Sequence, residues 1–324
     1  MQGLGRLHPS SLGEWQGCGK RFELTSVLRE RPAWRHPAAV NGTAIHSVIE
    51  SIHSLGLWAA PREEIARLWD SAFSEAVAHP VFEEERESPV FWGAGETEAT
   101  ARPKFAADAL DMLDGYRADR RNREANVLAA EARWRATFGG FDWEGTLDQA
   151  RDLGGGKVEV VDFKSGAERL AGPAFAMWPQ GLSYAMALKH ALFQPVGAAE
   201  HAPWRTRDMD VARVTWLHLR DYIPYRKNGA RADGTAYRKG DQRGPAYYSL
   251  EVTPQLLDAH AREIALFAKA VEAGRFERRP SNYQCSRCKV TEACLRAFMG
   301  SLDAEAVKGL NVTEGDYEPE AIGG

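Results

Sequence analysis

The sequence predicts an α/β protein in which helices cover a mixed central sheet. Apolar residues recur with helical spacing towards both ends of the chain, and three strand-like segments follow one another in its middle. Glycine pairs and triplets separate those segments, as expected for turns. With 44% hydrophobic and 27% charged residues among 324, the chain has enough apolar residues for a sizeable core. We expect one domain over residues 1–300.

Three helices are expected before the strands. The first is capped by Asn41-Gly42-Thr43, Pro61 opens the second, and 104–123 form the third. The apolar stripes of the first two consist of Ile45, Val48, Ile49 and Ile52, and of Ile65, Leu68, Trp69 and Phe73.

Strands are expected where the apolar period changes from helical to alternating. The three consecutive strands are Val127–Arg135, Phe141–Arg151 and Val158–Lys164, with turns at Gly139-Gly140 and Gly154-Gly155-Gly156. The elements expected after them are a helix over Phe175–Leu192, strands over Val211–Leu219 and Ala246–Val252, and a helix over Pro254–Arg275.

Charge alone does not identify a partner. The net charge of −4 is uneven, because the tail 301–324 carries −5 and leaves +1 for the rest. This acidic tail has few large apolar residues and is expected to be disordered. No apolar stretch approaches the roughly 20 residues of a membrane helix, and 1–21 hold no apolar run typical of a signal peptide. We therefore expect a cytoplasmic protein without a membrane partner.

Four cysteines indicate a metal site. Cys285, Cys288 and Cys294 follow a C-x₂-C-x₅-C spacing, and the fourth cysteine, Cys18, lies near the other end of the chain. Disulfides are an alternative, but clustered cysteines in a cytosolic chain are more often metal ligands. Zinc sites usually present two C-x₂-C pairs, and Cys18 has no cysteine nearby, so the spacing slightly favours an iron–sulfur cluster over zinc.

The strands carry a second group of chemical interest. Asp162 and Lys164 project from the same side of a strand, and Phe163 projects from the other. The hairpin through the glycine triplet can bring Asp148 next to Asp162. Two carboxylates suit Mg²⁺, or Mn²⁺ if an imidazole joins them, and a lysine beside such an ion can orient a water. The alternative is a surface ion pair at a strand end.

These motifs resemble the RecB-like branch of the PD-(D/E)XK nuclease superfamily. The resemblance rests on Gly145-Thr-Leu-Asp148, Val160-Val-Asp162-Phe-Lys164-Ser-Gly166 and Gln180-Gly-Leu-Ser-Tyr184 in this order. Three more segments are similar to the cysteine and histidine motifs of iron–sulfur members such as AddB-type nuclease domains and CRISPR-associated RecB-like exonucleases. They are Ser10–Phe22 around Cys18, Gly42-Thr-Ala-Ile-His46, and the triplet Cys285, Cys288 and Cys294. The similarity covers about residues 10–296 and implies a restriction-endonuclease-like fold whose ends are joined by a metal cluster.

The resemblance implies a role for each matching residue. Asp148, Asp162, His46 and the Phe163 carbonyl would hold Mg²⁺ or Mn²⁺, and Lys164 would be the catalytic lysine. Gln180 and Tyr184 would lie on one helix face beside the active site, and Glu131 is a weaker candidate for a supporting acid. Cys18, Cys285, Cys288 and Cys294 would hold a structural 4Fe-4S cluster. Two departures are Gly19 where the family often has proline, and Asp162 where some members have glutamate.

His53 competes with His46 as the histidine of the site. The residues alone do not separate the two, because both belong to a polar stripe with Glu50. The resemblance favours His46.

The segment 225–243 is a candidate DNA-binding loop. Six basic residues are interleaved there with Tyr225 and Tyr237, so that phosphates and unpaired bases could both be contacted. A solvated loop without a ligand is the alternative.

The expected function is metal-dependent DNA hydrolysis. The resemblance implies an exonuclease acting on single-stranded DNA or DNA ends in recombination, repair, CRISPR adaptation or phage DNA processing. The alternatives are a non-catalytic iron–sulfur DNA-binding subunit and a nuclease held together by zinc. The chain lacks a G-x-x-x-x-G-K-[ST] phosphate loop, so any helicase motor of that type would come from a separate protein.

Overall fold

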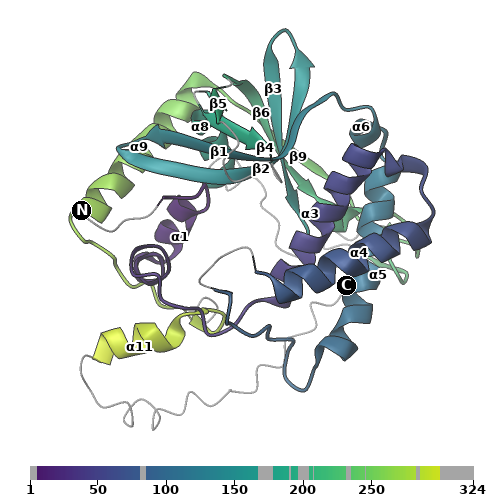
Figure 1. Cartoon of the computed structure of the whole chain (residues 1–324), viewed down its shortest axis with the longest axis horizontal. Helices are drawn as coiled ribbons and strands as arrows, with labels where there is room; N and C mark the ends of the chain where they lie inside the picture. The colour runs from purple at the N-terminus through teal and green to yellow at the C-terminus, as the bar shows by residue number, and fades with distance from the viewer. Residues whose placement is uncertain are drawn as a thin grey trace.

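A seven-stranded sheet forms the centre of the molecule, and helices cover both of its faces (Figure 1). The computed structural model describes residues 6–80, 85–166, 178–189, 191–195, 204–206, 208–230, 235–244, 246–281 and 285–299. The expected fold class, a mixed sheet flanked by helices, is confirmed. The acidic tail lies outside the described residues.

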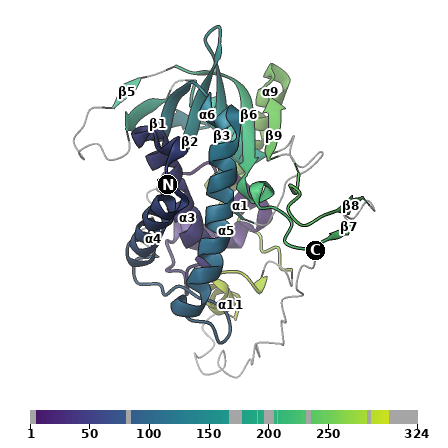
Figure 2. The same cartoon turned by 90° about the vertical axis from the view of Figure 1, so that its right-hand side faces the viewer.

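The strand order in the sheet is β5-β4-β1-β2-β3-β6-β9. All neighbours are antiparallel except β3 and β6, which are parallel. The strands are β1 (Val127–Phe138), β2 (Phe141–Gly154), β3 (Lys157–Lys164), β4 (Leu192–Pro195), β5 (Arg205–Thr206), β6 (Asp210–His218) and β9 (Tyr247–Glu251). A separate two-stranded hairpin consists of β7 (Gly229–Ala230) and β8 (Ala236–Tyr237), and Figure 2 shows that it projects from the body.

Two apolar cores lie on opposite faces of the sheet. One packs α1, α8 and α9 against β1 and β2 around Trp134, Trp143 and Phe267. The other packs α3, α4 and α5 against β3 and β6 around Ile49, Trp69 and further apolar side chains. The main helices are α1 (Ser11–Gly17), α3 (Pro37–Leu55), α4 (Arg62–Ala78), α5 (Glu98–Ala118), α8 (Pro179–Ala187), α9 (Pro254–Glu272) and α11 (Thr291–Met299). Shorter helical segments are α2 (Gly19–Phe22), η1 (Glu23–Val27, π-helical), η2 (Leu57–Ala59), α6 (Arg120–Arg123) and η4 (Leu219–Tyr222).

The expected cap of the first long helix is wrong. Helix α3 begins four residues before Asn41, at Pro37, whose fixed φ suits the first helical position. His36 caps the helix by accepting a hydrogen bond from the Ala38 backbone N–H at 3.1 Å. Asn41 is instead buried inside the helix, where it accepts a hydrogen bond from Trp69 Nε1 at 3.0 Å. Asn41 therefore joins α3 to α4.

Most other expected elements are confirmed with shifted ends. The three central strands are present and longer than expected, because both turns place glycines at positive φ and allow pairing close to the turn. Helix α5 starts at Glu98 rather than Lys104, because Thr97 and Thr100 form a capping box. Of the helix expected over Phe175–Leu192, the structure describes Pro179–Ala187, and 175–177 lie outside the described residues. No helix in the described part of the chain is long and apolar enough to cross a bilayer.

The buried imidazole of His260 makes stability depend on pH. His260 Nε2 on α9 lies 3.0 Å from Ser183 Oγ on α8, and the residue is 4% exposed. Burial lowers the pKa of His260 from 6.5 to about 4. The unfolded chain therefore takes up a proton near pH 6.5, and the folded chain does so only near pH 4. The neutral imidazole of His260 therefore makes its full contribution to the free energy of unfolding above pH 6.5. This contribution is lost as the pH falls towards 4.

We expect this group to lower the free energy of unfolding by about 2 kcal/mol between pH 7.5 and pH 5. Urea denaturation at both pH values measures the change. The variant His260→Gln should lose less stability over this range than the wild type. His79→Gln, at the exposed end of α4, is the matched control and should follow the wild type. An equal pH dependence in His260→Gln and the wild type would contradict the expectation.

Candidate active site

Neighbouring strands and helix α3 bring a histidine and two carboxylates together. Glu131 comes from β1, Asp148 from β2, and His46 from α3. His46 Nδ1 lies 3.5 Å from Asp148 Oδ1 and 3.7 Å from Glu131 Oε1. Each of the three residues offers a ligand atom within 4.8 Å of those of the other two. One imidazole nitrogen and two carboxylates form a ligand set that suits Mn²⁺, and the carboxylate oxygens also suit Mg²⁺.

His46 is held in an orientation that suits a ligand. Its Nε2 lies 3.2 Å from the Phe163 carbonyl oxygen, and its ring packs edge-on against the Phe163 ring. When Nε2 donates to that carbonyl, the lone pair of Nδ1 faces Asp148 and Glu131. The Phe163 carbonyl therefore lies at the rim of the group, and its role as a metal ligand stays a prediction.

Asp148 and Asp162 are neighbours, as the hairpin predicts. The register pairs Gln149 with Val161, and Asp148 Oδ2 accepts a hydrogen bond of 2.6 Å from the Phe163 backbone N–H. Phe163 itself is buried in the core between the sheet and α3. The carboxylates of the site thus share one face of the sheet at the end of β3, and Phe163 turns away from them.

Crowding of the carboxylates in a buried site changes their protonation. Burial raises the pKa of Glu131 to about 8, and Asp148 adds to the shift. Burial also raises the pKa of Asp162 to about 6, although Lys164 opposes the shift. Burial acts against the charged forms of Asp148 and His46 as well, but their mutual attraction outweighs it. The pKa of Asp148 is therefore lowered, and that of His46 is raised to about 9.

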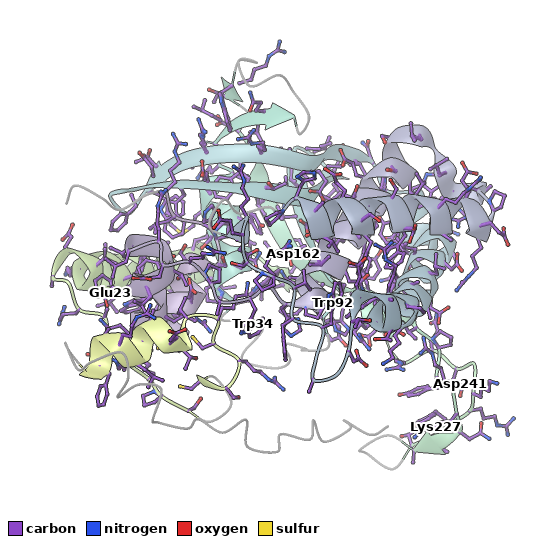
Figure 3. The ribbon with its side chains drawn as sticks, turned by 60° about the horizontal axis from the view of Figure 1, so that its bottom comes forward. Glu23, Trp34, Trp92, Asp162, Lys227 and Asp241 are labelled. Carbon is purple, nitrogen blue, oxygen red and sulfur yellow. The ribbon has the colours of Figure 1, made fainter. Side chains whose placement is uncertain are left out.

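Lys164, Asp162 and Gln180 form a second group beside the first (Figure 3 labels Asp162). Lys164 Nζ lies 2.5 Å from Asp162 Oδ2 and 3.2 Å from Gln180 Oε1. Gln180 Nε2 donates to Asp162 Oδ1 at 2.9 Å. Asp162 is 2% exposed and the Lys164 side chain is 28% exposed, so a buried carboxylate pairs with a half-buried ammonium group. Helix α8 thereby fixes the lysine head group next to the acidic cluster.

Tyr184 shares a helix with Gln180 but contacts a different part of the site. Its hydroxyl donates to the Thr146 carbonyl at 3.1 Å, and its ring packs against Trp134 in the core. It supports β2 two residues before Asp148, and its role in catalysis stays a prediction.

His53 does not take part in the acidic cluster. Its Nε2 lies 2.7 Å from the Tyr116 hydroxyl and 3.0 Å from Gln149 Nε2. Burial, followed by the charge of Arg151, lowers the pKa of His53 to about 4. Of the two histidines on α3, His46 is the one beside the carboxylates.

A family model of the PD-(D/E)XK nuclease superfamily matches residues 6–295. The chain belongs to this superfamily. Among solved structures, one titled "Putative exonuclease" from Eubacterium rectale matches with a TM-score of 0.47 and 9% identity, covering 92% of this chain and 94% of its own. SSO0001 matches with a TM-score of 0.26 and 11% identity, covering 60% of this chain and 79% of its own. No curated protein matches the sequence.

Glu131 has a more central place in this PD-(D/E)XK site than the sequence predicts. It was expected only as a weaker candidate for a supporting acid, and it belongs to the group of potential metal ligands. It has a φ of 43°, which is rare for a residue other than glycine, and it directs its carboxylate towards His46. No motif surrounds it in Ala129-Ala-Glu131-Ala. Only its place on the strand next to Asp148 could have indicated its importance.

Replacing Glu131 by glutamine should weaken Mn²⁺ binding on the order of tenfold, because one anionic ligand is lost without a change of size. Isothermal titration calorimetry on metal-free protein measures the affinity. Glu124→Gln, an exposed glutamate paired with Arg120, is the control and should bind as the wild type does. Equal affinities in the two variants would remove Glu131 from the ligand set.

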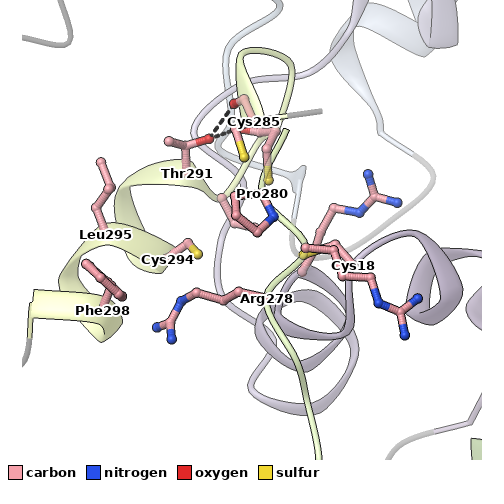
Figure 4. A pocket seen from close by; sticks show the side chains of 12 residues that line it. Cys18, Arg278, Pro280, Cys285, Thr291, Cys294, Leu295 and Phe298 are labelled. Atoms are coloured by element: carbon pink, nitrogen blue, oxygen red, sulfur yellow. Dashed lines mark hydrogen bonds between the residues drawn. The ribbon is translucent and has the colours of Figure 1, made fainter. Parts of the chain in front are cut away.

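The four cysteines line one pocket (Figure 4). Its volume is about 260 Å³. Cys18 lies between α1 and α2, the other three lie on or just before α11, and all four are free thiols. Arg21, Arg278 and Arg279 also line this pocket. Burial raises the pKa of the Cys288 thiol, and the charge of Arg21 opposes this shift.

The two ends of the chain also meet through backbone contacts around the cysteine pocket. Lys20 N donates to Glu277 O at 3.2 Å, and Ala33 N donates to Lys289 O at 2.9 Å. A Cβ atom on Gly19 would lie 2.9 Å from Glu277 N. Glycine after Cys18 therefore allows the close approach of the two segments, which gives a reason for this departure from the family motif.

In the described part of the candidate DNA-binding loop 225–243, the two tyrosines contact each other. The rings of Tyr225 and Tyr237 stack on each other with centroids 3.6 Å apart, and Tyr237 is 5% exposed. Arg226 pairs with Asp108 and Asp111 on α5. Figure 3 shows Lys227 and Asp241 on a projection at the lower right, away from Asp162 near the centre of the molecule. The tyrosine faces are thus occupied within the hairpin, and DNA binding by this loop stays a prediction.

Proposed function

We propose that this PD-(D/E)XK protein is a metal-dependent DNA exonuclease acting on single strands or strand ends. The observation that carries the proposal is the group formed by His46, Glu131 and Asp148 directly beside the ion pair of Lys164 and the buried Asp162. A surface ion pair would need neither the imidazole nor the amide of Gln180 that bonds both members of the pair. Metal-assisted hydrolysis of a phosphodiester needs ligands for the cation beside a group that offsets negative charge, and this arrangement offers both.

The residues present fit a divalent cation. His46, Glu131 and Asp148 would hold it, and Asp162 would add a carboxylate as the resemblance implies. A bound Mg²⁺ or Mn²⁺ would polarise the phosphodiester and lower the pKa of a bound water. Lys164 would place its positive charge where negative charge develops on the phosphate, and Gln180 would keep the ammonium group directed there. The water oxygen forms a bond to phosphorus as the bond to the leaving oxygen breaks.

We further propose that the chain belongs to the RecB-like branch and that its four cysteines hold a structural 4Fe-4S cluster. The shared pocket and its arginines support this proposal. A zinc ion with bonds of about 2.3 Å needs sulfurs roughly 3.8 Å apart. Among the described residues, no cysteine belongs to a set of three potential ligands within 4.8 Å. This wider arrangement favours a cluster over a single zinc ion, and metal analysis of anaerobically purified protein decides between iron and zinc.

An assay on single-stranded DNA labelled at its 5′ or 3′ end tests the proposed activity. Wild-type protein with Mn²⁺ should shorten the strand from one end, and the label that is released first gives the polarity. Asp162→Asn should reduce the rate about 10²–10³-fold. Asp142→Asn, an exposed aspartate on β2, is the control and should cut at the wild-type rate. DNA left intact by metal-loaded wild type, or cut equally by Asp162→Asn, would favour a non-catalytic DNA-binding subunit.

A further inference from the structure

An exposed group of aromatic side chains lies just before α3. Trp34, His36 and Phe91, here called the aromatic platform, have ring centroids 5.9 Å apart for Trp34 and His36 and 5.8 Å apart for Trp34 and Phe91. Phe91 is 50% exposed, His36 is exposed, and Trp34 is half-buried. The next residue, Trp92, turns inward and packs on Phe73 and Phe105. The platform is therefore not part of the core beneath it.

Arg35 fixes the platform rigidly. Its side chain is 7% exposed and donates to three backbone carbonyls, those of Ser88, Ala76 and Val77, at 2.9, 3.1 and 2.6 Å. Its backbone also pairs with the strand-like segment that carries Phe91, since Phe91 N donates to Arg35 O at 3.0 Å. Burial of an arginine on carbonyls is costly unless the hydrogen bonds are well made. The rings above it are consequently pre-organised before any ligand arrives.

Helix α3 connects the platform to the acidic cluster. His36 caps the helix and His46 lies ten residues further, a distance of about 15 Å at 1.5 Å per residue. Ala39 and Thr43, on the same face as His46, are small and exposed. A single DNA strand lying along this face of α3 would meet no bulky side chain at Ala39 or Thr43. At roughly 3.4 Å per nucleotide, the distance corresponds to about four stacked nucleotides.

A cavity of about 590 Å³ with several basic residues in its wall lies next to the segment that carries Trp34. Pro32 belongs to its wall, two residues before Trp34. Three of the basic residues in its wall have a glutamate partner: Lys289 pairs with Glu85 at 2.6 Å, Arg21 with Glu14 at 3.3 Å and Arg6 with Glu144 at 3.1 Å. The charged residues of the wall are Arg6, Arg21, Arg29, Arg287 and Lys289 against Glu14, Glu30 and Glu85. The excess is positive and suits phosphates.

The positive charge of this cavity reaches the platform. Burial lowers the pKa of His36, and Lys289 and Arg287 lower it further. Flat apolar rings next to cationic side chains match the two parts of a single-stranded nucleic acid, its bases and its phosphates.

We propose that the aromatic platform stacks on bases of a single DNA strand about four nucleotides from the phosphate that is cut, while the basic cavity holds phosphates further along the strand. This inference rests on the proposed function. It assigns to Trp34 and Phe91 a part in substrate binding and none in the chemical step.

Binding of a deoxyoligonucleotide of about 12 nucleotides to the Asp162→Asn protein tests the proposal. Trp34→Ala combined with Phe91→Ala should weaken binding about tenfold, the change expected for one stacked base. A DNA strand with abasic residues at the fourth and fifth positions from the end that is cut lacks the bases to be stacked. It should therefore bind with the same low affinity to the Asp162→Asn protein with and without the two alanine substitutions. Trp34→Tyr should retain most of the affinity. Trp204→Ala, whose ring packs on Arg135 by the β5 edge, is the matched control and should not change binding.

Unchanged affinity in the double variant, or an equal loss for intact and abasic strands, would overturn the platform as a stacking site. If wild type still cuts DNA in that case, the proposed function stands without it. A second measurement avoids substitutions in the platform: ultraviolet crosslinking of 5-iododeoxyuridine, placed at the fourth nucleotide, should label Trp34 or Phe91. Labelling confined to Tyr225 or to other sites would assign the strand a different path.

Discussion

Replacing Lys164 by methionine is expected to lower the rate of DNA cleavage about 10²–10³-fold. Methionine has a length similar to that of lysine but no charge, so the positive group beside Asp162 and Gln180 is removed with little change in packing. Single-turnover cleavage at saturating Mn²⁺ measures the chemical step. Calorimetry on the same protein shows whether the metal still binds.

Lys157→Met is the matched control for this experiment. Lys157 lies at the other end of β3 and is exposed, so it shares the strand with Lys164 but is distant from the carboxylates. It should cut DNA at the wild-type rate. If Lys164→Met cuts as fast as Lys157→Met with the metal bound, the lysine supports structure only and another group must stabilise charge on the phosphate.

If the four cysteines hold the proposed 4Fe-4S cluster, replacing Cys18 by serine should remove the iron and lower the free energy of unfolding by about 6 kcal/mol. A link between Cys18 and Cys285 closes a loop of roughly 270 residues, and the entropy of such a loop gives this estimate. Iron analysis, the visible absorption spectrum and thermal unfolding of anaerobic protein measure the two effects. The backbone contacts of Gly19 and Lys20 with Glu277 should keep part of the structure in place.

The double variant Cys18→Ser with Cys288→Ser tests whether the two cysteines belong to one shared site or act independently. Both cysteines line the same pocket, so either single change should remove the whole of the proposed cluster. The double variant should then lose little more stability than each single variant. Losses that add fully would show that the two cysteines act separately.

Local periodicity explains which parts of the site were predictable. Asp162 and Lys164 share a strand face by alternation alone, and the glycine triplet determines that Asp148 lies beside them. His46 and His53 share a stripe on α3, and only packing against β2 and β3 separates them. Glu131 needed a left-handed backbone position that no propensity indicates.

Contacts distant in sequence explain most of what was missed. Helix α3 starts at Pro37 because His36 caps it. Asn41, a more typical capping residue, is instead buried and accepts a hydrogen bond from Trp69. The aromatic platform depends on a bridge between Arg35 and Val90, more than fifty residues apart. The stacking of Tyr225 on Tyr237 likewise depends on the hairpin that brings the two rings together.

The protonation of the acidic cluster has a consequence for assembly. Near pH 7 the cluster without metal is electrically balanced: His46 and Lys164 are positive, Asp148 and Asp162 are negative, and Glu131, with its pKa raised to about 8, is neutral. Such a cluster needs no cation to offset repulsion between its carboxylates. On the proposed function, the polypeptide would fold without the cation, and binding of the cation would release the protons held by His46 and Glu131.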